Sequence, residues 1–325
     1  MKRRTFVLAT ALAAVLPQPV NPQTRRARLG ILNAGASRRA QSTIVPLLVK
    51  RLAGLGYVEG KNVIFEERYG AGEVDRLPAF ARELAALKLD LIISVGSEVG
   101  ARALIEAKPN VPLVLSAINY DPVETGFVAS YARPGSSVTG AYIPQPALAV
   151  KRFELARELM PSAKRFLVFS DALSKAQSIV VARAAEQGGL QLEMIQFAAD
   201  PYNYEAAFKQ GHRARMQALI VPLSNIFLRN RVRLADLALR HQLPAIGAET
   251  RFAEAGFLAA YSGSAAKLAA RTAEIAGDIL KGASPAVTAI EQVHDYELAL
   301  NLKTAKALAL NIPPAVMVRA MKVFG

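Results

Sequence analysis

The chain has 325 residues, 52% of them hydrophobic, which is enough apolar material for two packed domains. It has no cysteine, so disulfide bonds, thiolate metal sites and a lipid anchor on an N-terminal cysteine are excluded. Its formal net charge is +14, but the basic residues are spread over many predicted helices, so we expect no nucleic-acid partner and instead attraction to an anionic membrane surface or partner.

The chain begins with the pattern of an export signal. Arg3 and Arg4 precede an apolar run over residues 6–16. The run is too short to span a membrane, and the arginine pair resembles a twin-arginine signal. We therefore expect residues 1–24 to be a signal peptide and the rest to be exported to the periplasm as a soluble protein without a lipid anchor. A disordered basic tail is the alternative.

Residues 28–141 alternate between predicted strands and helices. Apolar runs rich in valine, isoleucine and leucine are too short for helices and are typical of parallel strands buried on both faces. The segments between them repeat apolar residues at helical spacing, so the pattern predicts a doubly wound α/β sheet. The expected elements are strand 28–33, helix 44–55, strand 62–69, helix 77–87, strand 89–95, helix 97–108, strand 111–117 and a strand ending at Gly140.

The same alternation begins again after Gly140 and predicts a second α/β lobe facing the first, with a cleft between them where a small molecule binds. Two strand–helix pairs are left over near the end, so we expect the chain to recross through a hinge that lets the lobes close as rigid bodies. The expected lobes are 28–141 plus 257–283 and 142–256 plus 284–325. The expected elements are helix 147–159, strand 165–170, helix 175–187, strand 190–197, helix 204–214, strand 218–223, helix 228–240, strand 244–247, and the pairs 256–261 with 264–280 and 296–301 with 302–308.

The motifs of common enzyme chemistries are missing from the sequence. No GxGxxG follows a strand, and neither a GxxxxGK[ST] phosphate loop nor a GxSxG nucleophile elbow is present. The SxxK pattern at 264–267 lacks its companion motifs, and His212, His241 and His294 lack the spacing of a zinc site. We therefore expect a binding protein with no catalytic residues, no cofactor and no metal.

Small polar residues follow the predicted strands in both lobes. Ligands of open α/β sheets bind in the crevice outside the carboxyl ends of the strands, where such loops meet. Hydroxyls, amides and helix N-terminal N–H groups bind a carboxylate or phosphate, and Asp121 and Glu249 suit an ammonium group. A helix N-cap is the alternative role for each residue. The expected ligand-binding residues are Asn33, Ser37, Gly96, Ser97, Asn119, Asp121, Ser170, Asp171, Ser224, Asn225, Glu249 and Tyr261.

An ordered series of short motifs runs through the chain after residue 24. They are Leu55–Val63, Asp75–Pro78, Asp121–Val123, Phe127–Ser130, Ala132–Gly135, Val138–Gly140, Leu243–Ile246, Ala255–Gly256 and Asn301–Leu308. The series resembles the ABC transporter substrate-binding family that includes tryptophan- and tyrosine-uptake binding proteins. The resemblance implies two Rossmann-like lobes of the type I periplasmic binding protein kind, joined by three crossing strands. It also implies delivery of a ligand to a permease and an ATPase, without catalysis, with the ligand contacted by loops 96–97, 121–122, 170–171 and 224–225.

Two stretches depart from the usual pattern of that family. Gly96-Ser97-Glu98-Val99 stands where the family usually has Gly-Thr-(Pro/Ala)-Ala, and Ala260-Tyr261-Ser262 stands where it often has Ser-Tyr-Gly. Because Glu98 near the cleft would alter selectivity, we expect a small polar or zwitterionic, amino-acid-like ligand and do not specify an aromatic one. We expect a monomer that serves an importer. An exported sensor subunit that reports ligand occupancy to a membrane receptor is the alternative.

Overall fold

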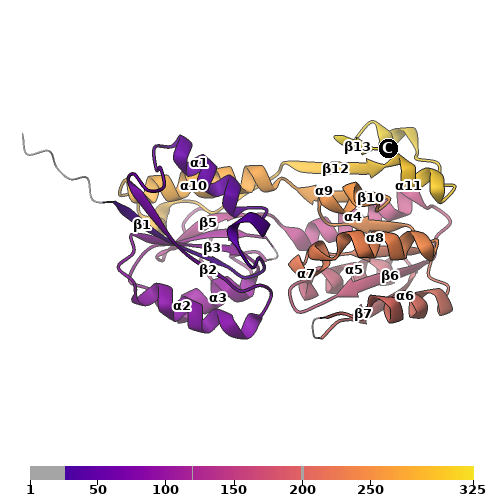
Figure 1. Cartoon of the computed structure of the whole chain (residues 1–325), viewed down its shortest axis with the longest axis horizontal. Helices are drawn as coiled ribbons and strands as arrows, with labels where there is room; N and C mark the ends of the chain where they lie inside the picture. The colour runs from indigo at the N-terminus through magenta and orange to yellow at the C-terminus, as the bar shows by residue number, and fades with distance from the viewer. Residues whose placement is uncertain (1–25, 119, 199–200) are drawn as a thin grey trace, which may run out of the picture.

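The computed structural model describes residues 26–118, 120–198 and 201–325. Within these ranges the chain forms two α/β lobes that lie side by side along the long axis of the molecule (Figure 1). Each lobe is built on one mainly parallel sheet with helices on both faces, as the alternating pattern predicts. The expected signal at residues 1–24 lies outside the described residues.

The first lobe contains a sheet with the strand order β11-β5-β4-β3-β1-β2. Strands β3 and β4 are buried along almost their whole length because helices cover both faces, which explains their continuous apolar sequences. Helices α1 and α10 pack together on one face, and α2 and α3 pack together on the other (Figure 1). The elements are β1 Ala27–Asn33, α1 Val45–Gly54, β2 Val63–Tyr69, α2 Leu77–Ala86, β3 Leu91–Gly96, α3 Glu98–Glu106, β4 Leu113–Ala117, β5 Val138–Tyr142, α10 Ala265–Leu280 and β11 Glu291–Gln292, with 3-10 turns at Arg39–Gln41, Val74–Arg76 and Pro285–Val287.

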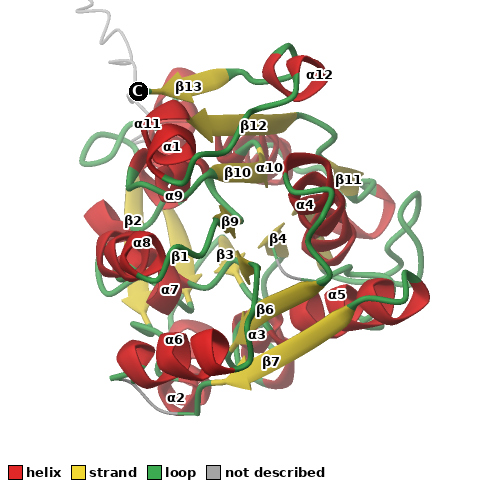
Figure 2. Cartoon of the chain, turned by 90° about the vertical axis from the view of Figure 1, so that its right-hand side faces the viewer, coloured by secondary structure: helices red, strands yellow, loops and turns green. Residues whose placement is uncertain are grey.

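The second lobe contains a sheet with the strand order β13-β12-β10-β9-β8-β6-β7, in which β12 runs antiparallel to β10. Figure 2 views this lobe end-on, with α4 and α5 on one face of the sheet and α6 and α8 on the other. The face under α6 and α8 packs a cluster of phenylalanines and tyrosines around Phe169. The elements are α4 Gln145–Leu159, β6 Arg165–Ser170, α5 Lys175–Gln187, β7 Gln191–Gln196, α6 Tyr204–Arg213, β8 Ala218–Val221, α7 Asn225–Arg229, α8 Arg231–Arg240, β9 Ala245–Gly247, α9 Thr250–Glu254, β10 Ala259–Gly263, β12 Tyr296–Asn301, α11 Leu302–Ala307, α12 Pro314–Met317 and β13 Lys322–Phe324.

The chain passes between the lobes between β5 and α4, between β10 and α10, and between β11 and β12. These segments lie against one another, since the Ser264 N–H donates to the Asp295 carbonyl at 2.8 Å and the Val293 N–H donates to the Tyr142 carbonyl at 2.9 Å. Short neighbouring crossings of this kind form a hinge about which two packed lobes can move as rigid bodies.

The expected lobe boundaries are wrong within the last two segments. Residues 259–263 form β10 of the second sheet, and only α10 from the segment 257–283 packs in the first lobe. Conversely, β11 pairs with β5 of the first sheet, and the Gly135 N–H donates to the Ala286 carbonyl. The alternation of strands and helices reveals each element but not the sheet to which it belongs, so a crossing inside a strand–helix pair leaves no mark in the pattern.

No helix among residues 26–118, 120–198 and 201–325 is long and apolar enough to cross a membrane. The same residues contain no group of three or more histidine, cysteine, aspartate or glutamate side chains arranged to hold a metal ion.

Candidate functional site

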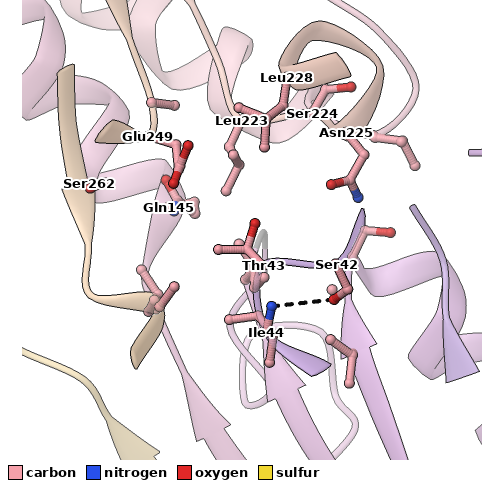
Figure 3. Close-up of a pocket in the computed structure, with 18 of the residues that line it drawn as sticks. Ser42, Thr43, Ile44, Gln145, Leu223, Ser224, Asn225, Leu228, Glu249 and Ser262 are labelled. Atoms are coloured by element: carbon pink, nitrogen blue, oxygen red, sulfur yellow. Dashed lines mark hydrogen bonds between the residues drawn. The ribbon is translucent and has the colours of Figure 1, made fainter. Parts of the chain in front are cut away.

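A cavity lies between the two lobes, beyond the carboxyl ends of strands from both sheets. The first lobe lines it with the ends of β1 and β3 and with the segment that leads into α1. The second lobe lines it with the loops after β6, β8 and β9 and with the end of β10. About 70 Å³ is open to the centres of water molecules, which is room for a small solute group. Figure 3 shows Ser42, Thr43 and Ile44 facing Leu223, Asn225 and Leu228 across this space.

Half of the side chains that line the cavity are aliphatic and the other half are polar. Among the described lining residues none is aromatic and none is basic, and Glu249 is the one acidic residue. The aliphatic part of such a wall removes an apolar group from water, while the polar part fixes the orientation of whatever binds. The apolar lining side chains are Ile44, Val95, Ile118, Ile143, Leu173, Leu223, Leu228, Ala248 and Ala265.

Ser97 supplies an unsatisfied hydroxyl from the first lobe. It is the residue before α3, and its Oγ is buried with no hydrogen-bond partner among the described residues. Buried polar atoms are nearly always paired, so a free hydroxyl at a helix N-terminus suits an external acceptor such as a carboxylate. Gly96 makes the turn possible because its φ of 111° lies in the region that side chains with a Cβ rarely adopt.

Asn33 also lines the cavity, but its polar atoms are used by its own loop. Its Oδ1 accepts from the Gly35 and Ala36 N–H groups at 3.0 and 2.8 Å, and its Nδ2 donates to the Ser42 Oγ at 3.0 Å. The Ser42 Oγ in turn accepts from the Val45 N–H at 3.1 Å and, more weakly, from the Ile44 N–H (Figure 3). Asn33 therefore shapes the loop, and Ser42 keeps one hydroxyl proton to donate.

Glu249 supplies a carboxylate from the second lobe at the start of α9. Its Oε2 accepts from the Arg251 N–H at 3.1 Å and from the Arg251 Nε at 3.0 Å. No described residue bonds to its Oε1. In Figure 3 the carboxylate lies on the same side of the cavity as Gln145. A half-satisfied carboxylate in a sheltered position suits a ligand that carries a positive charge.

Two polar contacts and one close approach join the lobes beside the cavity. Arg251 donates from Nη2 to the Thr43 Oγ1, and Arg229 donates from Nη1 to the Ala71 carbonyl at 3.3 Å. The Asn225 side chain lies so near Gly35 that a Cβ at Gly35 would be 1.4 Å from the Asn225 Nδ2. The lobes are therefore in contact on this side, in a closed arrangement.

Behind the wall formed by the second lobe lies a fully buried arginine, Arg152 on α4. Its Nη2 donates to the Gln145 Oε1 at 2.9 Å, to the Gln145 carbonyl at 3.2 Å and to the Gln177 Oε1 at 3.3 Å. Burial lowers the pKa of Arg152 to about 9, so the guanidinium stays charged at neutral pH.

The structure brings together Gly96, Ser97, Ser224, Asn225, Glu249 and Asn33 from the predicted set at the cavity. Their role in binding a ligand stays a prediction. Ser224 caps α7, where its Oγ donates to the Asp171 carboxylate and accepts from the Ile226 N–H at 3.2 Å. The N-cap alternative thus holds for Ser224, whereas no side-chain cap bond forms at Ser97.

The other predicted residues that the structure describes do not line this cavity. Asp171 and Ser170 are fully buried one layer behind it, and Asp171 accepts from the Leu173 N–H at 3.0 Å. Asp121 caps its own turn through the Val123 N–H at 2.8 Å, and Ser37 is exposed and bonds to Gln41. A residue after a strand can cap its own loop or face the ligand, and the sequence does not separate the two outcomes. Asn119 lies outside the described residues.

Tyr261 faces away from the cavity because side chains alternate along β10. Ser262 lines the cavity, whereas the Tyr261 ring lies 6.1 Å from the Tyr296 ring, centroid to centroid, against α4. Glu98, expected near the cleft, pairs with Arg102 along α3 and does not line the cavity.

Sequence reasoning missed Ser42, Thr43, Gln145 and Ser262 at the cavity. Ser42 and Thr43 lie just before α1, nine and ten residues past the end of β1, on a loop that folds back over the crevice and that the strand pattern does not predict. Gln145 follows the first crossing, and a hinge residue carries no strand-end signature. The period-2 pattern of β10 was the one available signal for Ser262.

A family model described as ABC transporter substrate binding protein matches residues 37–324. A tyrosine-binding protein of Clostridioides difficile (strain R20291) is 24% identical over 273 residues, which cover 80% of this chain and 74% of that protein. The family is one of substrate-binding proteins, which are not enzymes, so the chain is not an enzyme.

Two solved structures have the same two-lobed fold. An ABC domain from Streptococcus pneumonia in complex with L-Trp superposes with a TM-score of 0.80 at 25% identity, over 92% of this chain and 100% of that one. A substrate binding protein from Clostridium difficile in its ligand-free, open structure gives a TM-score of 0.66 at 23% identity, over 92% of this chain and 99% of that one. The type I periplasmic binding protein fold expected from the sequence is confirmed.

Proposed function

The chain belongs to the ABC transporter substrate binding protein family, and we propose from this premise that it binds a free amino acid with an apolar side chain between its lobes. We further propose that it does so in the periplasm and presents the amino acid to a membrane permease driven by an ATPase. The observation that carries the first proposal is one cavity with a free hydroxyl on one lobe, a free carboxylate oxygen on the other, and an aliphatic wall.

The polar groups suit the two charged ends of an amino acid. A carboxylate would accept from the Ser97 hydroxyl and from N–H groups at the start of α3. An ammonium would donate to the free Oε1 of Glu249. Because Ser97 and Glu249 belong to different lobes, a bound amino acid would hold the closed arrangement together.

The aliphatic wall suits the ligand's side chain. One relative is a tyrosine-binding protein and another is in complex with L-Trp, and both amino acids present a large apolar surface. The described lining of this chain offers leucine and isoleucine side chains and no aromatic ring, so leucine-like side chains suit it as well. We therefore propose amino acids with apolar side chains as the ligand class, and titration with individual amino acids identifies which member of this class binds.

Thermal unfolding and calorimetric titration with the twenty amino acids test the proposal. A ligand that binds only the folded chain stabilises it by about 2.7 kcal/mol at 100 times its Kd, so a true ligand raises Tm visibly. We expect such a shift for at least one apolar amino acid, together with compaction in small-angle scattering. A chain that neither binds nor compacts with any member of the panel would contradict the proposal. Uptake of the labelled amino acid by cells lacking the gene tests the role in import.

A further inference from the structure

Arg152 has surroundings that are unusual for an arginine. It is fully buried, and no carboxylate among the described residues pairs with it. Its Nε and Nη1 have no hydrogen-bond partner in the described part of the chain. A buried charge without a counter-ion is costly, and an uncharged side chain would pack there at lower cost. The stability of the fold therefore does not explain why an arginine occupies position 152.

The partners of Arg152 connect it to the cavity. A guanidinium has no acceptor, so the Gln145 Oε1, 2.9 Å from the Arg152 Nη2, must point inward. The Gln145 Nε2 then has no partner in residues 26–118, 120–198 and 201–325, and Gln145 lines the cavity. Arg152 in this way turns a side chain that can donate or accept into one that offers the cavity only donors.

A second partner of Arg152 fixes the neighbouring part of the wall. The Gln177 Oε1 accepts from Arg152 and also from the Leu223 N–H at 3.0 Å, while the Gln177 Nε2 donates to the Leu223 carbonyl at 3.0 Å. Leu223 begins the loop that carries Ser224 and Asn225 to the cavity. One buried cation therefore holds both the hinge residue Gln145 and this loop.

We propose that Arg152 is a positioning residue that makes the cavity select ligands with a free carboxylate, acting through the Gln145 amide. The inference rests on the proposed function and deepens it. The described lining contains no basic side chain, and no described carboxylate pairs with Arg152, whose guanidinium holds the lining residue Gln145. In the low-dielectric interior its charge attracts an anionic group at the cavity and polarises the Gln145 donors toward it. The guanidinium of Arg251, in contrast, forms an ion pair with the Glu249 carboxylate.

The test compares amino acids with their carboxamides, which keep the ammonium and the side chain but lose the negative charge. L-Tryptophan, L-tyrosine and L-leucine are titrated, each beside its amide, into the full chain and into the variants Arg152→Met and Gln145→Glu. Gln145→Glu places a carboxylate against the Arg152 guanidinium. The positive charge is then neutralised while the arginine side chain stays in place. The charge-matched control is Gln187→Glu, at the exposed end of α5 in the same lobe.

We expect the wild-type chain to prefer the acid. We expect both variants to lose at least about tenfold in affinity for the acid and to change less than about threefold for the amide. Gln145→Glu should melt at or above the wild-type temperature, so the loss cannot be ascribed to unfolding. Gln187→Glu should bind both ligands as the wild type does.

Equal losses for acid and amide would mean that Arg152 only supports the fold, and unchanged affinity for the acid in Gln145→Glu would also overturn the inference. If the wild-type chain binds neither acid nor amide from the full panel, the proposed function itself fails. These outcomes are distinguishable because the first two require a wild-type chain that binds.

Discussion

The two walls of the cavity offer polar groups in different ways. The wall from the first lobe is neutral, with Ser97 and Ser42 as donors and Asn33 committed to its own loop. The wall from the second lobe is charged, with Glu249 at the cavity and Arg152 one layer behind. On the proposed function, the second lobe senses the charges of the ligand, and the first lobe adds hydrogen bonds only when the lobes close. Binding therefore depends on both walls, but unequally.

Removing the charge of the second wall should have the largest effect. Glu249→Gln keeps an oxygen to accept from Arg251 but loses the charge that faces the ligand ammonium. We expect about a 10- to 100-fold loss of affinity for the amino acid in calorimetry, since hydrogen bonds to charged groups contribute ~1.5–3 kcal/mol. Glu254→Gln, exposed at the other end of α9, is the matched control. Unchanged affinity in Glu249→Gln would show that the second wall does not hold an ammonium.

Holding the walls apart should have the next largest effect. The φ of Gly35 is not in the left-handed region, so Gly35→Ala fits the first lobe by itself, but its Cβ would meet the Asn225 Nδ2 at 1.4 Å when the lobes close. We expect about a tenfold loss of affinity, because an overpacked contact costs ~1–3 kcal/mol. Small-angle scattering should show less compaction with ligand.

The control for Gly35→Ala is Gly54→Ala at the end of α1, where a Cβ would meet nothing within 4 Å. It should bind and compact like the wild type. A Gly35→Ala chain that compacts fully with ligand would show that the closed contact is not needed for binding.

Removing the neutral donor of the first wall should have a smaller effect. The Ser97 hydroxyl has no described partner, so Ser97→Ala should leave the Tm of the ligand-free chain unchanged or slightly higher. Affinity for the amino acid should fall about fivefold, as expected for one neutral hydrogen bond worth ~1 kcal/mol.

Ser116→Ala is the matched control for Ser97→Ala. Ser116 also has a buried hydroxyl without a described partner, but it does not line the cavity. We expect the same thermal behaviour and no change in affinity. Equal affinity losses in both variants would point to a general effect on the first lobe.

The smallest effect is expected at Tyr261, which was predicted to contact the ligand and faces away from the cavity. Tyr261→Phe should bind the amino acid within about twofold of the wild type, because Tyr261 lies on the other face of β10 and no described residue of the cavity is hydrogen-bonded to its hydroxyl. A tenfold loss would mean that the ligand site extends to the other face of β10.

The strand pattern predicted more of the fold than of the site. Buried parallel strands are recognisable as short apolar runs, so the inner strands of both sheets and the longer helices were predicted with small errors at their ends. The short edge strands β11 and β13 and the short helices α9 and α12 were not predicted, and the predicted helix 228–240 is divided into α7 and α8. The same reasoning did not distinguish loop residues that face the cavity from those that cap their own turn. Ser97 faces the cavity and Asp121 caps its own turn, although both follow strands. A polar residue after a strand satisfies either demand, and only the path of the loop decides between them.

The sequence by itself determined the two α/β lobes, the hinge between them and the edge of each sheet at which the cavity lies, because periodicity and strand chirality are local properties of the chain. Only the tertiary structure decided which sheet receives β10 and β11, which side chains reach the cavity, and that Arg152 lies behind Gln145. Those facts depend on contacts between residues distant in sequence, and the sequence alone does not show that Arg152 is buried.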